Sequence, residues 1–376
     1  MTQRRVLFLM SDTGGGHRSA AEAICAALAR EFPDRYDATL VDVFKRAAKF
    51  PLNHAPDLYL PLTQRAEFLW GTGFQLLNHR GTDRLAQISL RLNLMRGVQR
   101  ILREPIPDLV VSVHPVFNEL PRRVLRAYAP RVPFVTVVTD LFDAHRMWFD
   151  PGVDLCIVPT DGARRVAQRC GMPADKVRVI GQPISLKFLG DQRTQAEHRA
   201  ELGLAERTTI LLVGGGEGMG KLLDIARALD RARLPIQLVI IAGRNKALAD
   251  QLRALTWHLP AHIQGFVTNM PDWMRAADLI ITKAGPGTIM EALACGLPIL
   301  LSGFLPGQEN GNVTFVEQGG VGALRKNPDD IARLVGEWLT PGNDTLARFA
   351  ARARELARPH AALDIAHALH QVLDDA

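Results

Sequence analysis

Short apolar runs alternate with helix-like segments along most of the chain, and this rhythm restricts the fold more than any other feature. The runs, by residue number, are 6–10, 38–43, 109–113, 134–139 and 155–158, then 210–213, 238–242, 279–282 and 299–302. Strands that are apolar on both faces and separated by helices form parallel sheets covered by helices on either side. The sequence therefore predicts an α/β fold.

The rhythm restarts once, after a polar stretch at Leu189–Gln195 that suits a connector. A chain of 376 residues is also long for one domain. We therefore predict an N-terminal domain over 1–185 and a C-terminal domain over 186–340. The Ala- and Arg-rich tail, 341–376, is expected to form helices that pack back on the N-terminal domain.

Charge is uneven along the chain. Residues 1–185 carry 25 Lys and Arg against 18 Asp and Glu, whereas the remainder carries 20 against 21. A basic half favours an anionic partner such as a membrane surface, a nucleic acid or a phosphorylated substrate, although an ordinary solvated surface explains the charge equally well.

No apolar run approaches the roughly 20 residues that a membrane-spanning helix needs. The first run is broken at Ser11–Gly14, so we interpret it as the first strand of a cytoplasmic protein rather than a signal peptide. The four cysteines are scattered without metal-ligand spacing, which indicates free thiols.

Each half opens with a strand that runs into a glycine-rich loop and then a helix. The loops are Ser11–Ser19, which includes Gly15 and Gly16, and 214–220. Glycines let backbone N–H groups approach a phosphate or sugar closely, and the helix start adds a positive dipole end. Neither loop fits the dinucleotide fingerprint cleanly or forms a P-loop, which argues against NAD and ATP.

A second kind of turn follows the strand 279–282. There Gly285-Pro286-Gly287-Thr288 opens a helix that carries Glu291 about one turn further on. This spacing lets N–H groups and a hydroxyl meet a diphosphate while a carboxylate reaches a ribose diol. A capped helix with Glu291 as a favourable N-terminal charge is the alternative.

The loop Gly307–Asn312 carries several amide and carboxylate side chains, including Gln308 and Glu309. Closely spaced donors and acceptors suit the hydroxyls of a sugar, although a loop of this composition standing alone is more often a plain turn.

Together these segments resemble the monogalactosyldiacylglycerol synthases and the bacterial diacylglycerol glucosyltransferases. The similarity runs in family order from residue 6 to about 325, and is more distant to the lipid-linked N-acetylglucosaminyltransferase of peptidoglycan synthesis. The motifs that carry it are 14–20, 112–115, 136–141, 214–219, 243–246, 265–268, 283–288 and 307–309.

The resemblance implies a GT-B fold, with two Rossmann-like domains facing across a cleft. It also implies an inverting transfer of galactose or glucose from a UDP-sugar to the hydroxyl of diacylglycerol. The C-terminal domain would hold the nucleotide, and Gln308 and Glu309 would contact the donor sugar. The implied nucleotide-binding residues are Gly214, Gly215, Gly216, Gly218, Met219, Arg244, Phe266, Val267, Gly285, Pro286, Gly287, Thr288 and Glu291.

An inverting transfer needs a base for the acceptor hydroxyl. His17 ends the N-terminal glycine loop and fits this role, or that of positioning the acceptor, because imidazole titrates near neutral pH. Asp140, at a strand end, is the alternative base or a partner that orients an imidazole. His114 and His145 also match family positions, without a role that we can assign.

The chain contains no Asp-x-Asp, the usual device for holding a metal on a sugar diphosphate. We therefore expect neither a metal nor another cofactor. Helix termini and cationic side chains such as Arg244 would balance the leaving charge.

The stretch 80–103 predicts an amphipathic helix, with an apolar stripe flanked by arginines. The stripe comprises Leu85, Ile88, Leu92, Met95 and Leu102, and the arginines are Arg80, Arg84, Arg91, Arg96, Arg100 and Arg103. We expect 50–103 to dock on an anionic membrane at the inner face and to bind the acceptor. The alternative is that the stripe packs on the sheet. No nucleic-acid partner is expected.

Three other functions stay open at this point. The chain could transfer a sugar to another lipid-linked acceptor, or it could resemble the UDP-N-acetylglucosamine 2-epimerases, which share the fold class. It could also be a nucleotide sensor or membrane-binding module without catalysis. The intact glycine loops and the basic, apolar segment favour the lipid glycosyltransferase.

Overall fold

The computed structural model describes residues 3–12, 15–57, 82–214 and 221–375, and within these the side chains of 82–87 and 89 are left aside. The chain divides into two compact units. Unit 1 comprises Met1–Leu186, Leu305–Gly311 and His360–Ala376, and unit 2 comprises Lys187–Phe304 and Asn312–Pro359.

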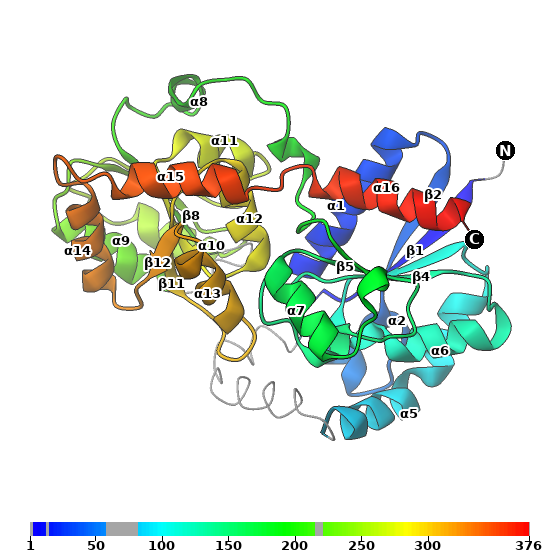
Figure 1. Ribbon diagram of the computed structural model, residues 1–376. Coiled ribbons are helices and arrows are strands. Elements are labelled where there is room, and N and C mark those ends of the chain that lie inside the picture. Colours follow the sequence, from blue (N-terminus) through cyan, green and yellow to red (C-terminus); the bar gives the residue numbers. More distant parts are fainter. Residues whose placement is uncertain (1–2, 13–14, 58–81, 215–220, 376) are drawn as a thin grey trace. The chain divides into compact units, whose positions relative to one another are not determined.

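Unit 1 is built on a six-stranded parallel sheet in the order β2-β1-β3-β4-β5-β6 (Figure 1). Its strands are β1 (Arg4–Met10), β2 (Tyr36–Asp42), β3 (Leu109–Ser112), β4 (Phe134–Val137), β5 (Leu155–Val158) and β6 (Val177–Val179). Its helices are α1 (Gly16–Glu31), α2 (Val43–Ala47), α5 (Thr82–Arg103), α6 (Glu119–Tyr128), α7 (Asp161–Arg169) and α16 (Ala361–Asp374).

Both faces of this sheet are covered, as its apolar strands require. Val6, Phe8 and Met10 face a core shared with α1 and α16, whereas Leu7 and Leu9 face a core shared with α2, α5, α6 and α7. Each fully buried side chain of this size contributes roughly 1.5–3 kcal/mol. Close packing also fixes α5, because a Cβ at Gly97 would lie 2.3 Å from the backbone of Ala47.

Unit 2 contains a second six-stranded parallel sheet, in the order β12-β11-β10-β7-β8-β9. Its strands are β7 (Thr209–Val213), β8 (Gln237–Ile241), β9 (Ala261–Gln264), β10 (Leu279–Lys283), β11 (Ile299–Gly303) and β12 (Gly322–Leu324). Its helices are α8 (Gln195–Glu201), α9 (Leu222–Arg231), α10 (Lys246–Arg253), α11 (Met270–Ala276), α12 (Pro286–Ala294), α13 (Asn310–Gln318, which starts in unit 1), α14 (Pro328–Trp338) and α15 (Thr345–Leu356).

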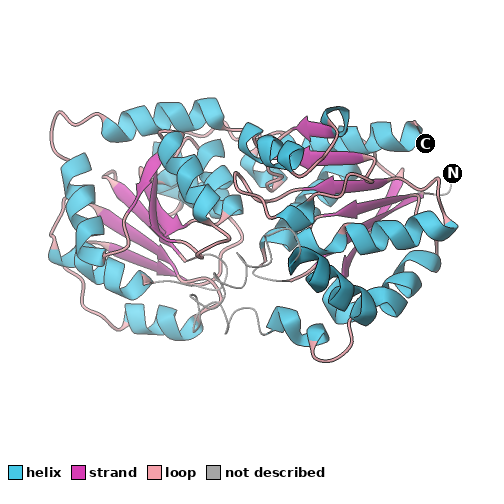
Figure 2. Cartoon of the chain, turned by 60° about the horizontal axis from the view of Figure 1, so that its bottom comes forward, coloured by secondary structure: helices cyan, strands magenta, loops and turns pink. Residues whose placement is uncertain are grey.

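The helices of each unit flank its sheet (Figure 2). In unit 2, Ile210, Leu212 and Ile240 pack against α9 and α14. The predicted α/β class with parallel sheets is confirmed.

The tail, which we expected to pack on the N-terminal domain, divides between the two units. Helix α15 groups with unit 2, and α16 groups with unit 1.

Among the described residues, no helix is long and apolar enough to cross a membrane.

Candidate functional site

In unit 1, the carboxyl ends of three neighbouring strands bring polar side chains together. His17 follows β1 at the start of α1, His114 follows β3, and Thr139 and Asp140 follow β4. These strands are adjacent in the sheet, so the residues that follow them share one edge. Ligands of open parallel sheets bind at this edge.

His17 lies in the first turn of α1, which starts after Gly15 because that residue adopts a left-handed conformation (φ 79°) that turns the chain into the helix. Its Nδ1 lies 3.2 Å from the hydroxyl of Thr139, and its ring also hydrogen-bonds the carbonyl of Val113. Burial lowers the pKa of His17 to about 4, against the opposing effect of the Val113 carbonyl. The imidazole is therefore neutral at pH 7, as a proton acceptor must be.

His114 lies against His17, with 4.6 Å between the ring centroids. It also stacks on Phe117 at 4.6 Å with 24° between the planes, and Phe44 meets it edge-on at 6.0 Å. The Nδ1 of His114 accepts from the N–H of Val116, which starts a 3-10 turn. Burial lowers the pKa of His114 well below its ordinary value, and proximity to His17 lowers it further.

Among the described residues, the side-chain hydrogen-bond partner of Asp140 is an indole rather than an imidazole. Its Oδ2 accepts a hydrogen bond of 2.6 Å from the indole N–H of Trp148. Burial raises the pKa of Asp140 to about 6, although the hydrogen bonds from Trp148 and from the backbone of His145 oppose this rise, and the nearby Glu309 adds to it. Trp148 is fully buried, and its ring centroid lies 5.9 Å from that of His17.

His145 and Asn118 hold this part of unit 1 together. His145 is buried, and its Nδ1 accepts from the N–H of Met147 at 3.2 Å, which caps the turn that carries Trp148. The buried amide of Asn118 donates to the carbonyls of His114, Pro115 and Met147. It therefore fixes the loops of His114 and Trp148 relative to each other.

The sequence did not indicate Thr139, Asn118 or Trp148 as site residues. Thr139 stands inside a predicted strand run, and the other two follow strand ends at a distance. Thr139 does fall within the family motif 136–141, whereas the only signal for Asn118 and Trp148 was their position in loops after β3 and β4.

In unit 2, the corresponding edge presents the predicted nucleotide-binding residues. Arg244 follows β8 and Phe266 follows β9, and the guanidinium carbon of Arg244 lies 4.5 Å from the ring centroid of Phe266. The Phe266 side chain is 56% exposed, which is unusual for a phenylalanine and leaves a ring free to stack on a planar ligand. Val267 is partly buried beside it.

The Gly285–Thr288 turn opens α12 directly after β10. No described side chain caps its N-terminal N–H groups, and a Cβ at Gly287 would meet nothing within 4 Å. Lys283 lies close to this turn, because its Nζ would be 3.6 Å from a Cβ atom added at Gly285. Open N–H groups and a lysine at a helix start suit an anionic group. Pro286 occupies the first turn, where its missing N–H has no cost.

Glu291 lies on α12, one turn beyond Thr288. Burial raises the pKa of its carboxyl to about 7. The loop from β10 to α12 is fastened by Asn312, whose amide donates to the carbonyl of Ala284 at 2.8 Å.

Of the remaining predicted site residues, some lie outside the described part of the chain. Gly214 directly follows β7 and is buried, whereas Gly215, Gly216, Gly218 and Met219 fall outside the described residues. Glu309 is buried and accepts from the N–H of Leu305 at 2.8 Å, so its carboxylate holds the loop in which it lies. Gln308 is half-buried in the same loop, and Gly16 is exposed beside Gly15.

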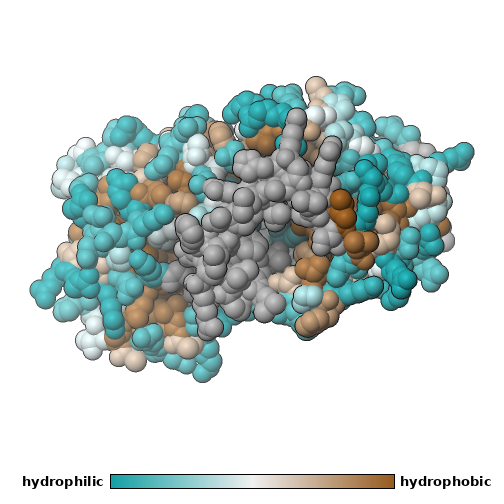
Figure 3. All heavy atoms as spheres, turned by 90° about the horizontal axis from the view of Figure 1, so that it is seen from below, coloured by the Kyte–Doolittle hydropathy of each residue, from teal (hydrophilic) through white to brown (hydrophobic). Residues whose placement is uncertain are grey.

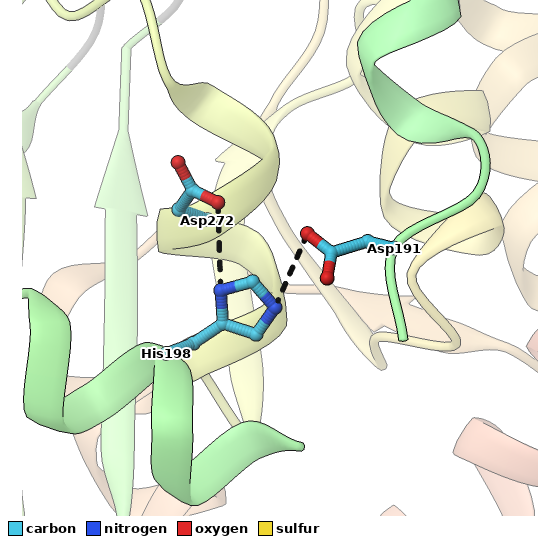
Figure 4. Close-up of side chains that lie close together, drawn as sticks. All are labelled: Asp191, His198 and Asp272. Carbon is cyan, nitrogen blue, oxygen red and sulfur yellow. Dashed lines mark ion pairs between the residues drawn. The ribbon is translucent and has the colours of Figure 1, made fainter. Parts of the chain in front are cut away.

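A further cluster lies at the start of unit 2, where His198 of α8 stands between Asp191 and Asp272 (Figure 4). Its ring nitrogens lie 3.6 Å and 3.4 Å from these carboxylates. Arg193 pairs with both aspartates, and Arg275 with Asp191. Two guanidinium groups therefore already balance the carboxylates, so this cluster fits an ion-pair network better than a divalent metal.

The apolar stripe predicted for residues 80–103 is buried in one half of α5 and exposed in the other. Leu102 is fully buried and Met95 packs against the core, so this half follows the alternative of packing within unit 1. In contrast, Ile88 is 52% and Leu92 78% exposed. The side chains of Arg80, Arg84 and Leu85 fall outside the described residues. Arg91 pairs with Glu119, and Arg96, Arg100 and Arg103 are exposed.

Figure 3 shows apolar surface on the side of unit 1 that carries α5. Phe50, 80% exposed, and Ile106, 52% exposed, add to the apolar side chains at the surface of unit 1. Next to α5, an apolar cavity of about 30 Å³ is walled by Leu90, Leu94 and Phe117 among others. Since Phe117 also stacks on His114, this cavity adjoins the polar cluster.

Comparison with known proteins agrees with this architecture. A model of the monogalactosyldiacylglycerol synthase family matches residues 17–184, and a model of the C-terminal domain of glycosyltransferase family 28 matches residues 209–353. Among solved structures, MurG of Acinetobacter baumannii superposes with a TM-score of 0.63 at 16% identity, over 98% of this chain and 99% of that one. A putative UDP-N-acetylglucosamine 2-epimerase of Listeria monocytogenes gives 0.62 at 14% identity, over 100% and 98%.

The fold and the matched domains define a glycosyltransferase of the GT-B class, which confirms the expected class of enzyme. Monogalactosyldiacylglycerol synthases 2 and 1 of Arabidopsis thaliana are 40% and 38% identical to it, over 96% and 98% of this chain and 79% and 71% of theirs. The chain therefore belongs to the monogalactosyldiacylglycerol synthase family, as its motifs indicated.

Proposed function

We propose that this enzyme transfers galactose from UDP-galactose to the hydroxyl of diacylglycerol, with inversion at the anomeric carbon. The observation that carries the proposal is identity of about 40% over nearly the whole chain to enzymes named for this product. The polar cluster of unit 1 and the open α12 terminus of unit 2 supply groups that such a reaction needs.

The acceptor side of the reaction is assigned to unit 1. His17 takes the proton of the acceptor hydroxyl as the hydroxyl oxygen bonds to the anomeric carbon. The bond from that carbon to the diphosphate breaks, and UDP leaves with the electron pair. His17 later releases its proton to solvent. A neutral imidazole supports this role, and its contacts with Thr139 and Val113 keep the ring in one orientation.

The donor side is assigned to unit 2. Phe266 and Val267 would lie along the uracil, Glu291 would accept from the ribose hydroxyls, and the N–H groups of Gly285–Thr288 would bind the diphosphate. The exposed Phe266 ring and the uncapped start of α12 support this assignment. Gly214–Met219 would complete the diphosphate site. Gln308 and Glu309, which belong to the Leu305–Gly311 segment of unit 1, would contact the sugar.

No metal or other cofactor enters this proposal. The chain lacks Asp-x-Asp, and the Asp191–His198–Asp272 cluster is already balanced by arginines. Lys283, beside Gly285, and the α12 dipole would offset the charge of the departing UDP. Arg244, which we named from the sequence, stacks on Phe266 and would contribute less.

The enzyme would meet its lipid at an anionic membrane surface, on the cytoplasmic side. The exposed Phe50, Ile88 and Leu92, with Arg96, Arg100 and Arg103 on the same segment, support docking through this part of unit 1. No role in binding nucleic acid is proposed.

Product analysis tests this function. The purified protein is incubated with vesicles containing diacylglycerol and with labelled UDP-galactose or UDP-glucose, and the lipids are then separated. We expect a lipid bearing one galactose, with UDP-glucose used more slowly. A glucosylated lipid as the main product would show that the donor is UDP-glucose. Transfer only to another lipid would show that the acceptor is not diacylglycerol.

An epimerase is the second candidate, because a putative 2-epimerase superposes about as well as MurG. These structures are at most 16% identical to this chain and bear on the fold alone. Consumption of UDP-N-acetylglucosamine without lipid, giving an isomerised nucleotide sugar, would favour the epimerase. UDP binding without any sugar release would favour a non-catalytic sensor.

A further inference from the structure

The hydrogen bond between Trp148 and Asp140 joins a fully buried indole to a partly buried carboxylate. The indole N–H donates to the carboxylate over 2.6 Å, and Trp148 has no exposed surface. A buried indole needs an acceptor, but a backbone carbonyl or an amide oxygen would satisfy it. A carboxylate adds a negative charge that is costly to bury.

That cost is visible at Asp140, because burial raises the pKa of its carboxyl to about 6. The hydrogen-bond donors to the carboxyl are Trp148 and the backbone of His145, and the charged group facing it is Glu309, which has the same sign. Ionisable groups with a strongly shifted pKa cluster at functional sites, where charge changes during a reaction.

The indole connects Asp140 to His17. The ring centroids of Trp148 and His17 are 5.9 Å apart with 54° between the planes, and His114 lies on His17 at 4.6 Å. His114 is held neutral by burial, so it offers the ring no counter-charge. A cation within about 6 Å of an indole is attracted to its π system, and a carboxylate bound to the indole N–H strengthens that attraction.

We propose that Asp140 and Trp148 act as a pair of positioning residues that orient His17 and stabilise the imidazolium formed when it accepts the acceptor's proton. The proposal rests on His17 being the base, as proposed above. Asp140 acts through the indole and exchanges no proton with substrate.

The test is a double-mutant cycle of Asp140→Asn and Trp148→Phe, with kcat and KM measured from pH 5 to 9. Asn keeps an oxygen for the indole N–H but removes the charge, and Phe keeps an aromatic ring but removes the N–H. We expect each single variant to lower kcat by roughly 10- to 100-fold, in the range found for residues that orient a reactive histidine. KM for the UDP-sugar should change less than twofold.

Two further readouts separate this role from a purely structural one. The acidic limb of the kcat profile is expected near pH 6 in the wild type, where the Asp140 carboxyl becomes protonated and loses its charge. It should move below pH 5 in Asp140→Asn, because that variant has no charge to lose there and the pKa of His17 is about 4. In the Trp148→Phe background, Asp140→Asn should cost less than threefold, because the connection is already broken. Additive losses, or an unmoved acidic limb, would overturn the proposal.

If Asp140→Asn does not fold, Trp148→Phe alone decides, since it must reproduce the shifted limb and the loss in kcat. His17→Ala distinguishes this inference from the function on which it rests. If His17→Ala is fully active, His17 is not the base. If His17→Ala is inactive and the Asp140→Asn profile is unshifted, only the proposed role of the Asp140–Trp148 pair is excluded.

Discussion

The rings of His17 and His114 lie 4.6 Å apart at the carboxyl edge of the first sheet, and burial keeps both imidazoles neutral at pH 7. Two histidines that follow different strands meet because β1 and β3 are neighbours in the sheet. A neutral imidazole is the form that can accept a proton, which is the role proposed here for His17.

Replacing His17 by Ala should lower kcat for transfer by roughly 10²- to 10⁴-fold, the range for loss of a general base. Affinity for UDP, measured by calorimetry, should be unchanged because the residues proposed to bind the nucleotide lie in unit 2. His367→Ala is the matched control, since His367 is an exposed histidine of unit 1 that pairs with Glu31. Full turnover by His17→Ala would remove this residue from the mechanism.

Glu291→Gln should weaken UDP binding by roughly 5- to 30-fold, the equivalent of about 1–2 kcal/mol for a lost charged hydrogen bond. In the wild type, affinity should decline as the pH falls through about 7, where the Glu291 carboxyl becomes protonated. The variant should bind with little pH dependence and should no longer distinguish UDP from its 2′-deoxy analogue. A variant that still discriminates would place the ribose elsewhere.

The same carboxyl should also affect stability. Its folded pKa is raised to about 7, so its stabilising effect is present below the unfolded value near 4.5 and is lost as the pH rises through 7. Glu291→Gln should therefore gain up to ~3 kcal/mol in free energy of unfolding relative to the wild type between pH 5 and pH 8. Urea titrations at both pH values measure this, and an equal difference at both would contradict it.

Phe266→Ala should weaken UDP binding by roughly 10-fold, because stacking of a base on an aromatic ring is worth about 1–3 kcal/mol. Vesicle binding should not change. The matched variant is Phe50→Ala, which removes an exposed phenylalanine from unit 1. It should weaken vesicle binding and leave the affinity for UDP unchanged. If both variants lowered both affinities, the two sites would not be separate.

Changing Arg96, Arg100 and Arg103 together to Glu should abolish binding to vesicles that contain anionic lipid, since each arginine near such a surface is worth about 1 kcal/mol. The control changes Arg231, Arg333 and Arg348, which are exposed arginines of unit 2. Unchanged cosedimentation of the first variant with vesicles would exclude α5 as the docking surface.

Transfer should continue in EDTA, because the proposed site uses Lys283 and a helix terminus rather than a divalent ion. Activity is measured before and after chelation and again with added Mg²⁺. Complete loss that Mg²⁺ restores would show that a metal takes part.

The sequence was sufficient for the central strands and for the edge strand β2, but not for the other three edge strands. The predicted runs all lie in strands or at their ends, because they are mostly apolar. Three strands were missed, namely β6, β9 and β12. Each has three or four residues, and β9 is partly exposed throughout, so none has the apolar pattern of a buried parallel strand.

The same limit applies to the polar cluster. Family motifs singled out His17, His114 and Asp140, but they did not indicate that Asp140 binds Trp148 instead of an imidazole. Trp148 lies eight residues further along, after a loop and at the end of a 3-10 turn capped by His145. Only tertiary packing brings the indole between the carboxylate and His17.

The most direct test of the central claim is the structure of the product made from UDP-galactose and diacylglycerol. We predict that NMR of the purified lipid will show a single galactose in β linkage to the glycerol hydroxyl, the configuration left by one inversion of the α-linked donor. An α-linked galactose, or an isomerised nucleotide sugar with no glycolipid, would contradict the account.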